Sequence, residues 1–289
     1  MPAEQWQVGD VTIQRVGEMT LGHEIMARLI PDASAQALLR LPWLRPSFVD
    51  TAGRMSGSIH ALVVRTPQRL IIVDTCVGKD KVRKNPDFHR LQSSVLDDLL
   101  AGGVAPDAVD TVLCTHLHID HVGWNTVLRE GRWVPTFANA RYLFGRTELE
   151  HWGGDHGALE RLDVAAVMAD SVQPILDAGL ADLVETDHRL CSEVSLVPTP
   201  GHTPGHVSVL IESQGLSALI TGDFLHHPCQ FAHPDWASSP DGDPALNRMT
   251  RHAMFERYAD SPTLIIGTHF AAPTAGRLVR DGKAFRFET

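Results

Sequence analysis

Apolar residues in this chain fall in short runs bounded by glycine, proline and acidic residues. Most runs are rich in valine, isoleucine and leucine, which favours strands over helices. The runs predict strands at Val11–Val16, Ile59–Arg65, Leu70–Val73, Thr111–Cys114, Arg141–Phe144, Ser195–Val197, Val207–Ile211, Ala218–Thr221, Leu264–Ile266 and Arg277–Val279.

Helical spacing of apolar residues appears in other segments. It predicts helices at Ser93–Leu100, Arg146–His151, Ala158–Met168, Val172–Ala178 and Pro244–Tyr258. In the last of these, Leu246, Met249, Ala253 and Tyr258 are predicted to share one apolar face. Strands outnumber helices in both halves, so the pattern predicts a mixed α and β protein with two packed sheets and helices outside.

Residues 19–57 depart from this pattern because apolar bulk is interrupted by prolines, which prevent a long helix or a central strand. This segment is predicted to be a long loop with a short helix. It would cover a site or a partner subunit, or lie on the surface with a few packed anchors. No repeat or low-complexity linker divides the chain, so residues 1–289 are predicted to form a single domain.

The composition of the chain narrows the range of functions that it could have. The chain has 35 acidic and 25 basic residues and a formal net charge of −10, so nucleic acid would be repelled. The amino terminus has no basic start with an apolar run, and no stretch approaches the length of a membrane span. We therefore expect a cytoplasmic protein with a small-molecule substrate, and neither a nucleic acid nor a membrane as partner.

The 4 cysteines form no C-x-x-C pair. Cys76, Cys114 and Cys191 lie in apolar, strand-like runs and are expected to be buried free thiols. Cys229 lies closer to the candidate chemistry, and its role stays open.

Three histidines and an aspartate are concentrated between Thr115 and His121, directly after the predicted strand at Thr111–Cys114. In an extended turn His116 and His118 point the same way, while Asp120 and His121, expected to open a helix, turn towards a neighbouring point. Imidazole and carboxylate ligands suit Zn²⁺ and similar ions. This one segment could thus serve two metal positions.

An isolated histidine is more often a packed or surface residue than a ligand. Here the pattern repeats: His202, Asp223 and His269 each follow a predicted strand and stand beside or near glycine, which allows a sharp turn. Four strand ends that each carry a ligand-type residue favour a metal site over packing.

These motifs, from about Val11 to Phe287, resemble the metallo-β-lactamase-fold hydrolase superfamily. The resemblance implies an α+β fold with four layers in the order αββα. It implies that His116, His118 and His202 bind one metal, that Asp120, His121 and His269 bind a second, and that Asp223 and a hydroxide bridge them. Asp74 matches the family's early aspartate, which supports the ligand loops from behind.

The bridging position separates branches of the family. An aspartate there, Asp223, is similar to glyoxalase II, lactonases, phosphotriesterases and processing nucleases, whereas true β-lactamases have Cys or Ser. His118 stands where flavodiiron proteins usually carry Glu. The segments Val73–Gly78 and Thr221–Gln230 resemble the branch of N-acyl homoserine lactonases and methyl parathion hydrolase, whose members often use the amino-terminal segment over the pocket or in a homodimer contact.

The resemblance implies a dinuclear hydrolase in which a metal-bridging hydroxide attacks the carbonyl of a small, moderately hydrophobic lactone or ester. The cofactors would be two divalent ions, Zn²⁺ first, with Mn²⁺, Fe²⁺ or Co²⁺ as alternatives. Catalysis is assigned to Asp120 and Asp223. The alternatives are a phosphotriesterase-like or glyoxalase II-like thioester hydrolase and, from another class, a mononuclear iron dioxygenase. A binding module without activity would have lost ligands, and none is missing.

Substrate contacts are the open part of this interpretation. Homoserine lactonases place a tyrosine shortly after the bridging aspartate, but the only tyrosines here are Tyr142 and Tyr258. His226 or His227 would replace that donor, or would be outward or supporting histidines. Phe231 and Phe270, with Trp43, Leu44, Phe48 and Trp236, are predicted to form an apolar pocket wall, and core packing is the alternative.

Overall fold

Two sheets contain nearly all the strands, and each belongs mainly to one of two units into which the chain divides. The computed structural model describes residues 4–154 and 163–289. Unit 1 comprises residues 4–18 and Ile59–Thr186, and unit 2 comprises Met19–Ser58 and Asp187–Thr289.

The sheet of unit 1 has seven strands in the order β1-β2-β3-β4-β5-β8-β9. Its antiparallel part holds β1 and β2, which form a hairpin, and β3, which pairs with β4; β4, β5, β8 and β9 run parallel. The strands are β1 (Gln5–Val8), β2 (Val11–Leu21), β3 (Gly57–Arg65), β4 (Leu70–Val73), β5 (Thr111–Leu113), β8 (Arg141–Gly145) and β9 (Ala181–Val184). Since β4 and β5 are parallel, the residues that follow them emerge at the same edge.

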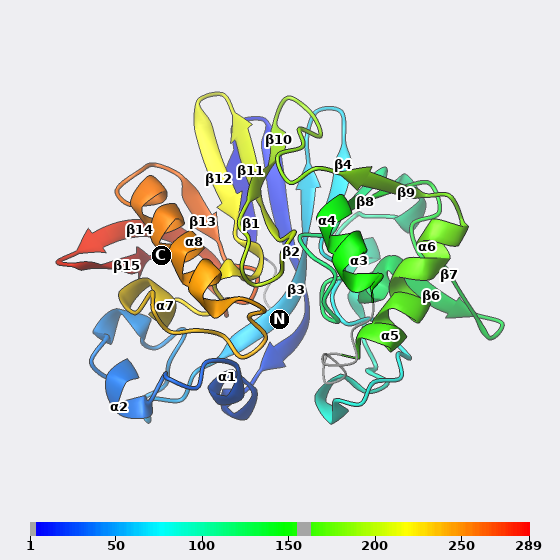
Figure 1. Ribbon diagram of the computed structural model, residues 1–289. Helices are drawn as coiled ribbons and strands as arrows, with labels where there is room; N and C mark the ends of the chain where they lie inside the picture. The colour runs from blue at the N-terminus through cyan, green and yellow to red at the C-terminus, as the bar shows by residue number, and fades with distance from the viewer. Residues whose placement is uncertain (1–3, 155–162) are drawn as a thin grey trace. The chain divides into compact units, whose positions relative to one another are not determined.

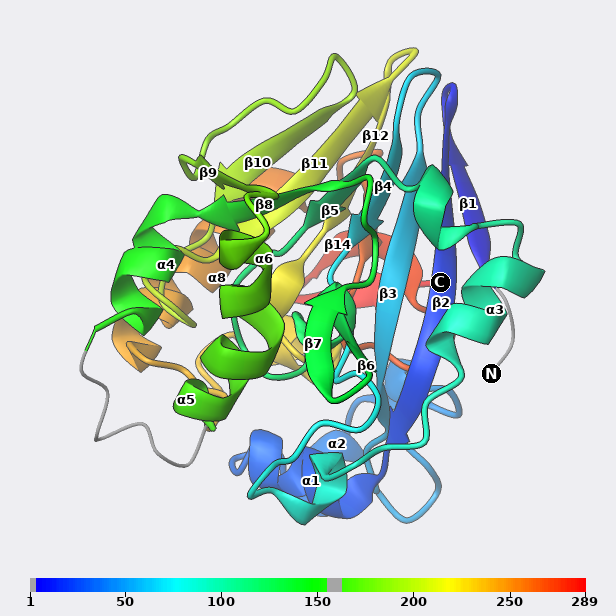
Figure 2. The ribbon, with the colours of Figure 1, turned by 90° about the vertical axis from the view of Figure 1, so that its right-hand side faces the viewer.

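The described part of unit 1 also contains a separate hairpin and four α-helices. The hairpin is formed by β6 (Thr126–Arg129) and β7 (Arg132–Pro135), and the helices are α3 (Val95–Ala101), α4 (Arg146–Trp152), α5 (Val164–Val167) and α6 (Gln173–Asp177). Figure 2 looks onto unit 1 from the side of the β6–β7 hairpin and of helices α4 and α6. A π-helical turn at Met168–Val172 joins α5 to α6.

The sheet of unit 2 has six strands in sequence order: β10 (Val194–Pro198), β11 (Val207–Ser213), β12 (Leu216–Ile220), β13 (Leu264–Ile266), β14 (Ala275–Asp281) and β15 (Ala284–Glu288). All neighbours are antiparallel except β12 and β13. Both β10 and β12 pair antiparallel with β11, so they run parallel to each other. The strands β10, β12 and β13 therefore all end at one edge of the sheet.

Four helices belong to unit 2: α1 (His23–Leu29), α2 (Ala35–Leu38), α7 (Cys229–Ala232) and α8 (Pro244–Tyr258). Figure 1 shows α8 in orange, beside the strands of this sheet. Asp243 begins α8 by accepting the backbone N–H of Leu246 at 2.9 Å, and Pro244 occupies the first turn, where its missing N–H costs nothing.

All the predicted strands are present, and α8 has the predicted bounds. The predicted apolar face of α8 is not the face that packs: Leu246, Met249 and Ala253 are exposed, and of the four residues only Tyr258 is buried. The helix instead buries Asn247, Thr250, Arg251, Met254, Phe255 and Tyr258. Part of the predicted helix at Ala158–Met168 lies outside the described residues, and α5 occupies Val164–Val167 within its remainder.

Residues 19–57 contain more helix than predicted: α1, α2 and a 3-10 turn at Pro42–Leu44. Its apolar anchors are fully packed, since Met26, Ile30, Leu38 and Leu44 have no exposed surface. Whether the segment covers a pocket or a partner subunit stays a prediction. Within residues 4–154 and 163–289, no helix combines the length and the apolar composition needed to cross a bilayer.

Cys76, Cys114 and Cys229 are buried free thiols, and burial raises the pKa of each. The expectation for Cys191 was wrong, because its side chain is half-buried in the turn before β10.

Candidate metal centre

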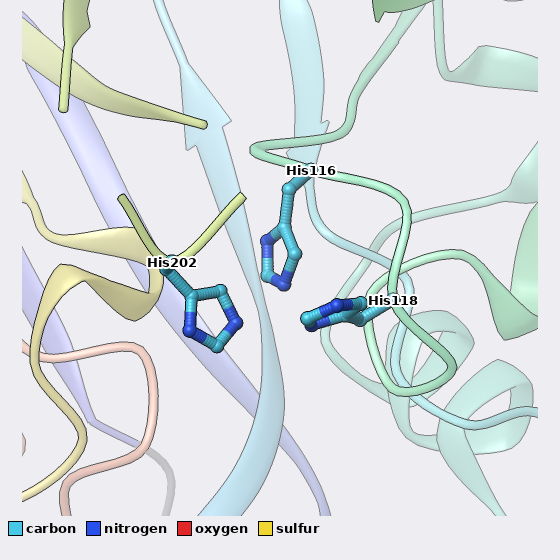
Figure 3. Close-up of side chains that lie close together, drawn as sticks. All are labelled: His116, His118 and His202. Atoms are coloured by element: carbon cyan, nitrogen blue, oxygen red, sulfur yellow. The ribbon is translucent and has the colours of Figure 1, made fainter. Parts of the chain in front are cut away.

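The histidine-rich segment of unit 1 follows β5. The rings of His116 and His118 lie 4.5 Å apart between centroids at 77°, and those of His116 and His121 lie 4.0 Å apart. Figure 3 shows His116 and His118 on this loop. Asp120 Oδ1 lies 3.5 Å from His121 Nε2. The helix expected to begin at Asp120 is absent: Asp120 and His121 lie in a turn, and a short 3-10 helix starts at Gly123.

Asp74, after the parallel strand β4, lies behind this segment. Its carboxylate accepts the backbone N–H of Thr115 at 2.8 Å and lies 3.0 Å from His121 Nδ1. The carboxylate therefore fixes the His121 ring with Nε2 as its outward nitrogen, as carboxylates behind metal-bound histidines do.

The loop that carries Asp74 is strained. Asp74 and Cys76 adopt φ values of +57° and +55°, a region that L residues other than glycine seldom occupy. The conformation is held by neighbouring bonds: Thr75 N–H donates to His121 O at 2.7 Å, and Trp124 N–H donates to Thr75 O at 2.8 Å.

Glycine is required where these two loops meet. A Cβ at Gly123 would stand 1.9 Å from the carbonyl oxygen of Val77. The half-buried carboxylate of Glu18 joins the same two loops, because it accepts from Val77 N at 2.6 Å and from Trp124 Nε1 at 2.9 Å. Burial raises the pKa of Glu18, and these hydrogen bonds oppose that rise.

Helix α4 contributes a second support. Glu148, buried in α4, accepts the Leu117 N–H at 3.3 Å and the Trp152 indole N–H at 2.7 Å. The Trp152 ring in turn stands edge-on to His118, with centroids 5.2 Å apart. Glu148 thus holds both the backbone between His116 and His118 and the ring against which His118 packs.

In unit 2, His202, Asp223 and His269 follow β10, β12 and β13, the strands that end at one edge. Figure 3 shows the His202 ring extending from its loop. Asp223 Oδ2 lies 3.6 Å from His202 Nε2, 3.2 Å from His269 Nε2 and 3.0 Å from His226 Nε2. Ligand atoms of His202, Asp223 and His226 all lie within 4.8 Å of one another, and all three residues are buried.

The opposite nitrogens of these rings have fixed partners. His202 Nδ1 lies 2.9 Å from Asp241 Oδ1, and His269 Nδ1 lies 3.0 Å from the carbonyl of Ser58. Burial alone would raise the pKa of Asp241, but the hydrogen bond and charge of His202 lower it to about 2. The buried Arg251 guanidinium lies 3.6 Å from the other Asp241 oxygen.

His206 was not assigned a role from the sequence, although it ends the same Gly-His-Thr-Pro-Gly-His motif as His202. Its Nε2 accepts the Asp223 backbone N–H at 2.7 Å, and its Nδ1 lies 3.0 Å from Thr199 O. Gly222 has φ +60°, and a Cβ there would approach His206 Nε2 to 2.6 Å. A second histidine in the motif was the available signal; Asp241 gave a weaker one, in Asp-Gly-Asp-Pro.

The two histidines after Asp223 differ in their surroundings. His227 Nε2 lies 3.1 Å from Phe48 O, and its Nδ1 accepts the Cys229 N–H at 3.1 Å. Burial lowers the pKa of His227 to about 4. Both ring nitrogens of His227 thus form hydrogen bonds with backbone atoms, whereas the ring of His226 faces Asp223.

The aromatic residues predicted to form a pocket wall divide into two groups. Phe48, Phe231 and Phe270 are at most 2% exposed and pack with Phe287 at centroid distances of 5.3 to 6.0 Å. This is the packing that the sequence left as the alternative. Leu44 is also buried, and Trp43 and Trp236 are half-buried. Substrate contact by Phe231 and Phe270 stays a prediction.

The donor set of each unit suits divalent metal ions. Unit 1 supplies three imidazoles and a carboxylate on one turn, and unit 2 directs imidazole Nε2 atoms at one carboxylate. Neutral imidazole with carboxylate oxygen is a typical ligand set for Zn²⁺ and similar ions, and the Nδ1 partners orient the rings for it.

Comparison with curated proteins shows that the chain is similar in sequence to N-acyl homoserine lactonases. The chain is 32% identical over 178 residues to the N-acyl homoserine lactonase AiiA of Bacillus thuringiensis subsp. kurstaki. The alignment covers 57% of this chain and 63% of that protein, so the chain spans somewhat less than two thirds of the relative's length.

Solved structures extend the likeness to nearly the whole chain. The hydrolase AbOPH of the beta-lactamase superfamily matches with TM-score 0.81 and 27% identity, over 99% of this chain and 96% of that one. The dizinc quorum-quenching lactonase AidC matches with TM-score 0.79 and 20% identity, over the same shares. These matches confirm the predicted α+β metallo-β-lactamase fold.

The family model described as the metallo-beta-lactamase superfamily matches residues 56–269. This range contains β3 to β13 and every candidate ligand from His116 to His269. The chain belongs to the metallo-β-lactamase superfamily.

Proposed function

We propose that this chain is a metal-dependent hydrolase that opens small lactones or cleaves related esters with two divalent ions. The ligands are His116, His118, Asp120, His121, His202, Asp223 and His269. The observation that carries the proposal is the buried ligand set after β10, β12 and β13, where His202 and His269 direct Nε2 at Asp223.

Family membership supplies the division of the ligands. By the ligand pattern of the superfamily, His116, His118 and His202 would hold one ion, Asp120, His121 and His269 would hold the other, and Asp223 would contribute to both. Zn²⁺ is the first candidate for this set of nitrogen and oxygen ligands, and Mn²⁺, Fe²⁺ and Co²⁺ are alternatives.

When bound, the ions would supply a water activated near neutral pH and Lewis-acid charge for the carbonyl oxygen. The chain's own residues hold the geometry. Asp74 and Asp241 fix the tautomer of His121 and His202 through Nδ1. Asp120, whose carboxylate lies beside His121, would orient the nucleophile and pass a proton to the leaving oxygen.

The lactone substrate class is supported by the 32% identity to N-acyl homoserine lactonase. The tyrosine donor of those enzymes has no counterpart here, and His226 takes its place better than His227. The Nε2 of His226 lies 3.0 Å from Asp223 Oδ2, beside the reacting centre, whereas His227 Nε2 is committed to Phe48 O.

An assay panel tests this proposal directly. The metal-loaded protein is given N-acyl homoserine lactones, aryl esters, phosphotriesters, thioesters and β-lactams, with metal analysis of the same sample. We expect the highest kcat/KM for lactones or esters and two divalent ions per chain. A phosphotriester or thioester preference would move the substrate to that class, and a single redox-active iron would favour the dioxygenase.

The ligand assignment is tested separately. His116→Ala should abolish turnover with the far-UV circular dichroism spectrum unchanged. Full activity in this variant, with two ions still bound, would refute the assignment.

A further inference from the structure

Gln230, which is fully buried in α7, determines the hydrogen-bond directions behind His226. Its Oε1 accepts the backbone N–H of His226 at 2.6 Å and that of His227 at 3.2 Å. Because both partners are donors, Oε1 must lie on this side and the amide NH₂ on the other. The NH₂ donates to Trp236 O at 3.0 Å and to Ser238 Oγ at 3.3 Å.

Ser238 accepts this hydrogen bond from Gln230, and this determines where its own hydroxyl hydrogen can point. Its Oγ lies 2.8 Å from His226 Nδ1. The Ser238 hydroxyl has a single hydrogen, and since Gln230 already donates to Oγ, that hydrogen is available for Nδ1. The Ser238 backbone N–H donates to Asp241 Oδ2 at 3.0 Å, which keeps the residue in place.

The other side of the ring requires the same arrangement. His226 Nε2 lies 3.0 Å from the acceptor Asp223 Oδ2, as the Nε2 atoms of His202 and His269 also approach it. Of these three rings, only that of His226 has a hydroxyl rather than an acceptor oxygen at Nδ1, which leaves Nε2 for the imidazole hydrogen. With Nδ1 accepting from Ser238 and Nε2 donating to Asp223, both contacts of the ring are satisfied by one neutral tautomer.

This tautomer matters because His226 occupies a position from which it could bind a metal ion. His202, Asp223 and His226 could hold an ion by distance alone. An Nε2 that carries hydrogen has no lone pair for a metal, however. The geometry points to Gln230 and Ser238 as positioning residues that hold His226 as an Nε2–H donor beside Asp223 and exclude it from the metal ligands.

This inference deepens the proposed function and rests on it only for the presence of metal. It assigns to the Nε2–H group of His226 the role of a hydrogen-bond donor towards substrate oxygens that react next to Asp223. The side chains that specify this donor, Gln230 and Ser238, stand on the far side of the ring from Asp223.

The tautomer can be observed by long-range ¹H–¹⁵N correlation of histidine rings, in metal-free and Zn²⁺-loaded protein. The His226→Gln spectrum assigns the ring. We expect hydrogen on Nε2 and a lone pair on Nδ1 in both states. Hydrogen on Nδ1, a doubly protonated ring or a zinc-bound Nε2 would overturn the inference.

Variants test the positioning residues. Ser238→Ala should give a mixture of tautomers, and Ser238→Thr, which keeps the hydroxyl, should restore the wild-type pattern. Gln230→Glu replaces the donating NH₂ with an acceptor and should shift hydrogen towards Nδ1. An unchanged tautomer in folded Ser238→Ala protein would contradict the inference, and if the variants fail to fold, the wild-type spectrum still decides it.

Kinetics give a second readout. Ser238→Ala should lower kcat by less than the about 100-fold that loss of a whole hydrogen-bond donor costs, because part of the population keeps the donor tautomer, with KM changed less and with two ions bound. Ser238→Thr should recover most of the loss. If the wild type hydrolyses nothing in the panel, the proposed function fails, while the ring spectra still test the tautomer.

Discussion

At the scale of residues, His226 and His227 are adjacent in the sequence and differ in their contacts. His226 faces Asp223, and His227 joins two backbone groups far apart in the chain, at Phe48 and Cys229. Histidine identity alone could not separate them, because the separation depends on which backbone atoms reach each ring.

The buried His227 should make the protein sensitive to acid. Its pKa is about 4 when folded and about 6.5 when unfolded, so between these values the unfolded chain binds the extra proton. The free energy of unfolding should fall from pH 6.5 to pH 4, by at most about 3.4 kcal/mol from this residue.

Urea unfolding of metal-free protein at several pH values measures this effect. His227→Gln keeps a donor and an acceptor but does not titrate, so its stability should fall less with acid. Parallel curves for wild type and variant would count against the prediction.

Phe270 tests the packing of the aromatic residues. It is fully buried among Phe48, Phe231 and Phe287. Phe270→Ala should lower the free energy of unfolding by about 3–5 kcal/mol in denaturant titrations, because the ring leaves a cavity. Leu246→Ala on the exposed face of α8 is the control and should change stability by under about 0.5 kcal/mol.

The same variant addresses substrate contact. If Phe270 also lines the pocket, KM should rise with acyl length in Phe270→Ala relative to wild type. An unchanged KM across acyl lengths would leave Phe270 a packing residue only.

At the scale of elements, α4 supports the ligand turn through Glu148. Glu148→Leu removes the acceptor for Leu117 N–H and Trp152, so Zn²⁺ affinity should fall about 10- to 100-fold in competition with a chromophoric chelator. Glu148→Gln keeps an acceptor oxygen and should lose less. Equal affinities for the two variants would show that the acceptor is not needed.

The strands and the ligand turns could be predicted because their signals are local. Runs such as Leu70–Val73 and Leu264–Ile266 are apolar throughout, and ligand-type residues follow them directly. Shorter or more polar strands were missed, among them β1, β6, β7, β9 and β15, since strands such as Ala181–Val184 have no clear alternation.

The face of α8 could not be predicted, because burial there follows polar partners. Arg251 is buried by its contacts with Pro234 O and Asp241, and Thr250 by its hydrogen bond to Pro200 O. Apolar periodicity does not detect such partners. For the same reason the sequence indicated the proposed metal ligands but not Glu148, Gln230 or Ser238, which contact those residues or their neighbours from other elements.

At the scale of the whole molecule, the proposed ions should stabilise the folded chain. A ligand that binds only the folded state adds about 4 kcal/mol when its free concentration is a thousand times its Kd. Chelation should therefore lower the thermal midpoint and abolish turnover, and Zn²⁺, Mn²⁺ or Co²⁺ should restore both. Identical melting curves with and without chelator would argue against resident metal.

The contact between His269 and Ser58 has a consequence for biosynthesis. His269 Nδ1 is oriented by a carbonyl 211 positions earlier in the chain. A ribosome must therefore synthesise the chain through residue 269 before the Ser58 carbonyl can orient this ring. The histidines near His116 are synthesised earlier, so the proposed metal centre cannot be complete until residue 269 has been made.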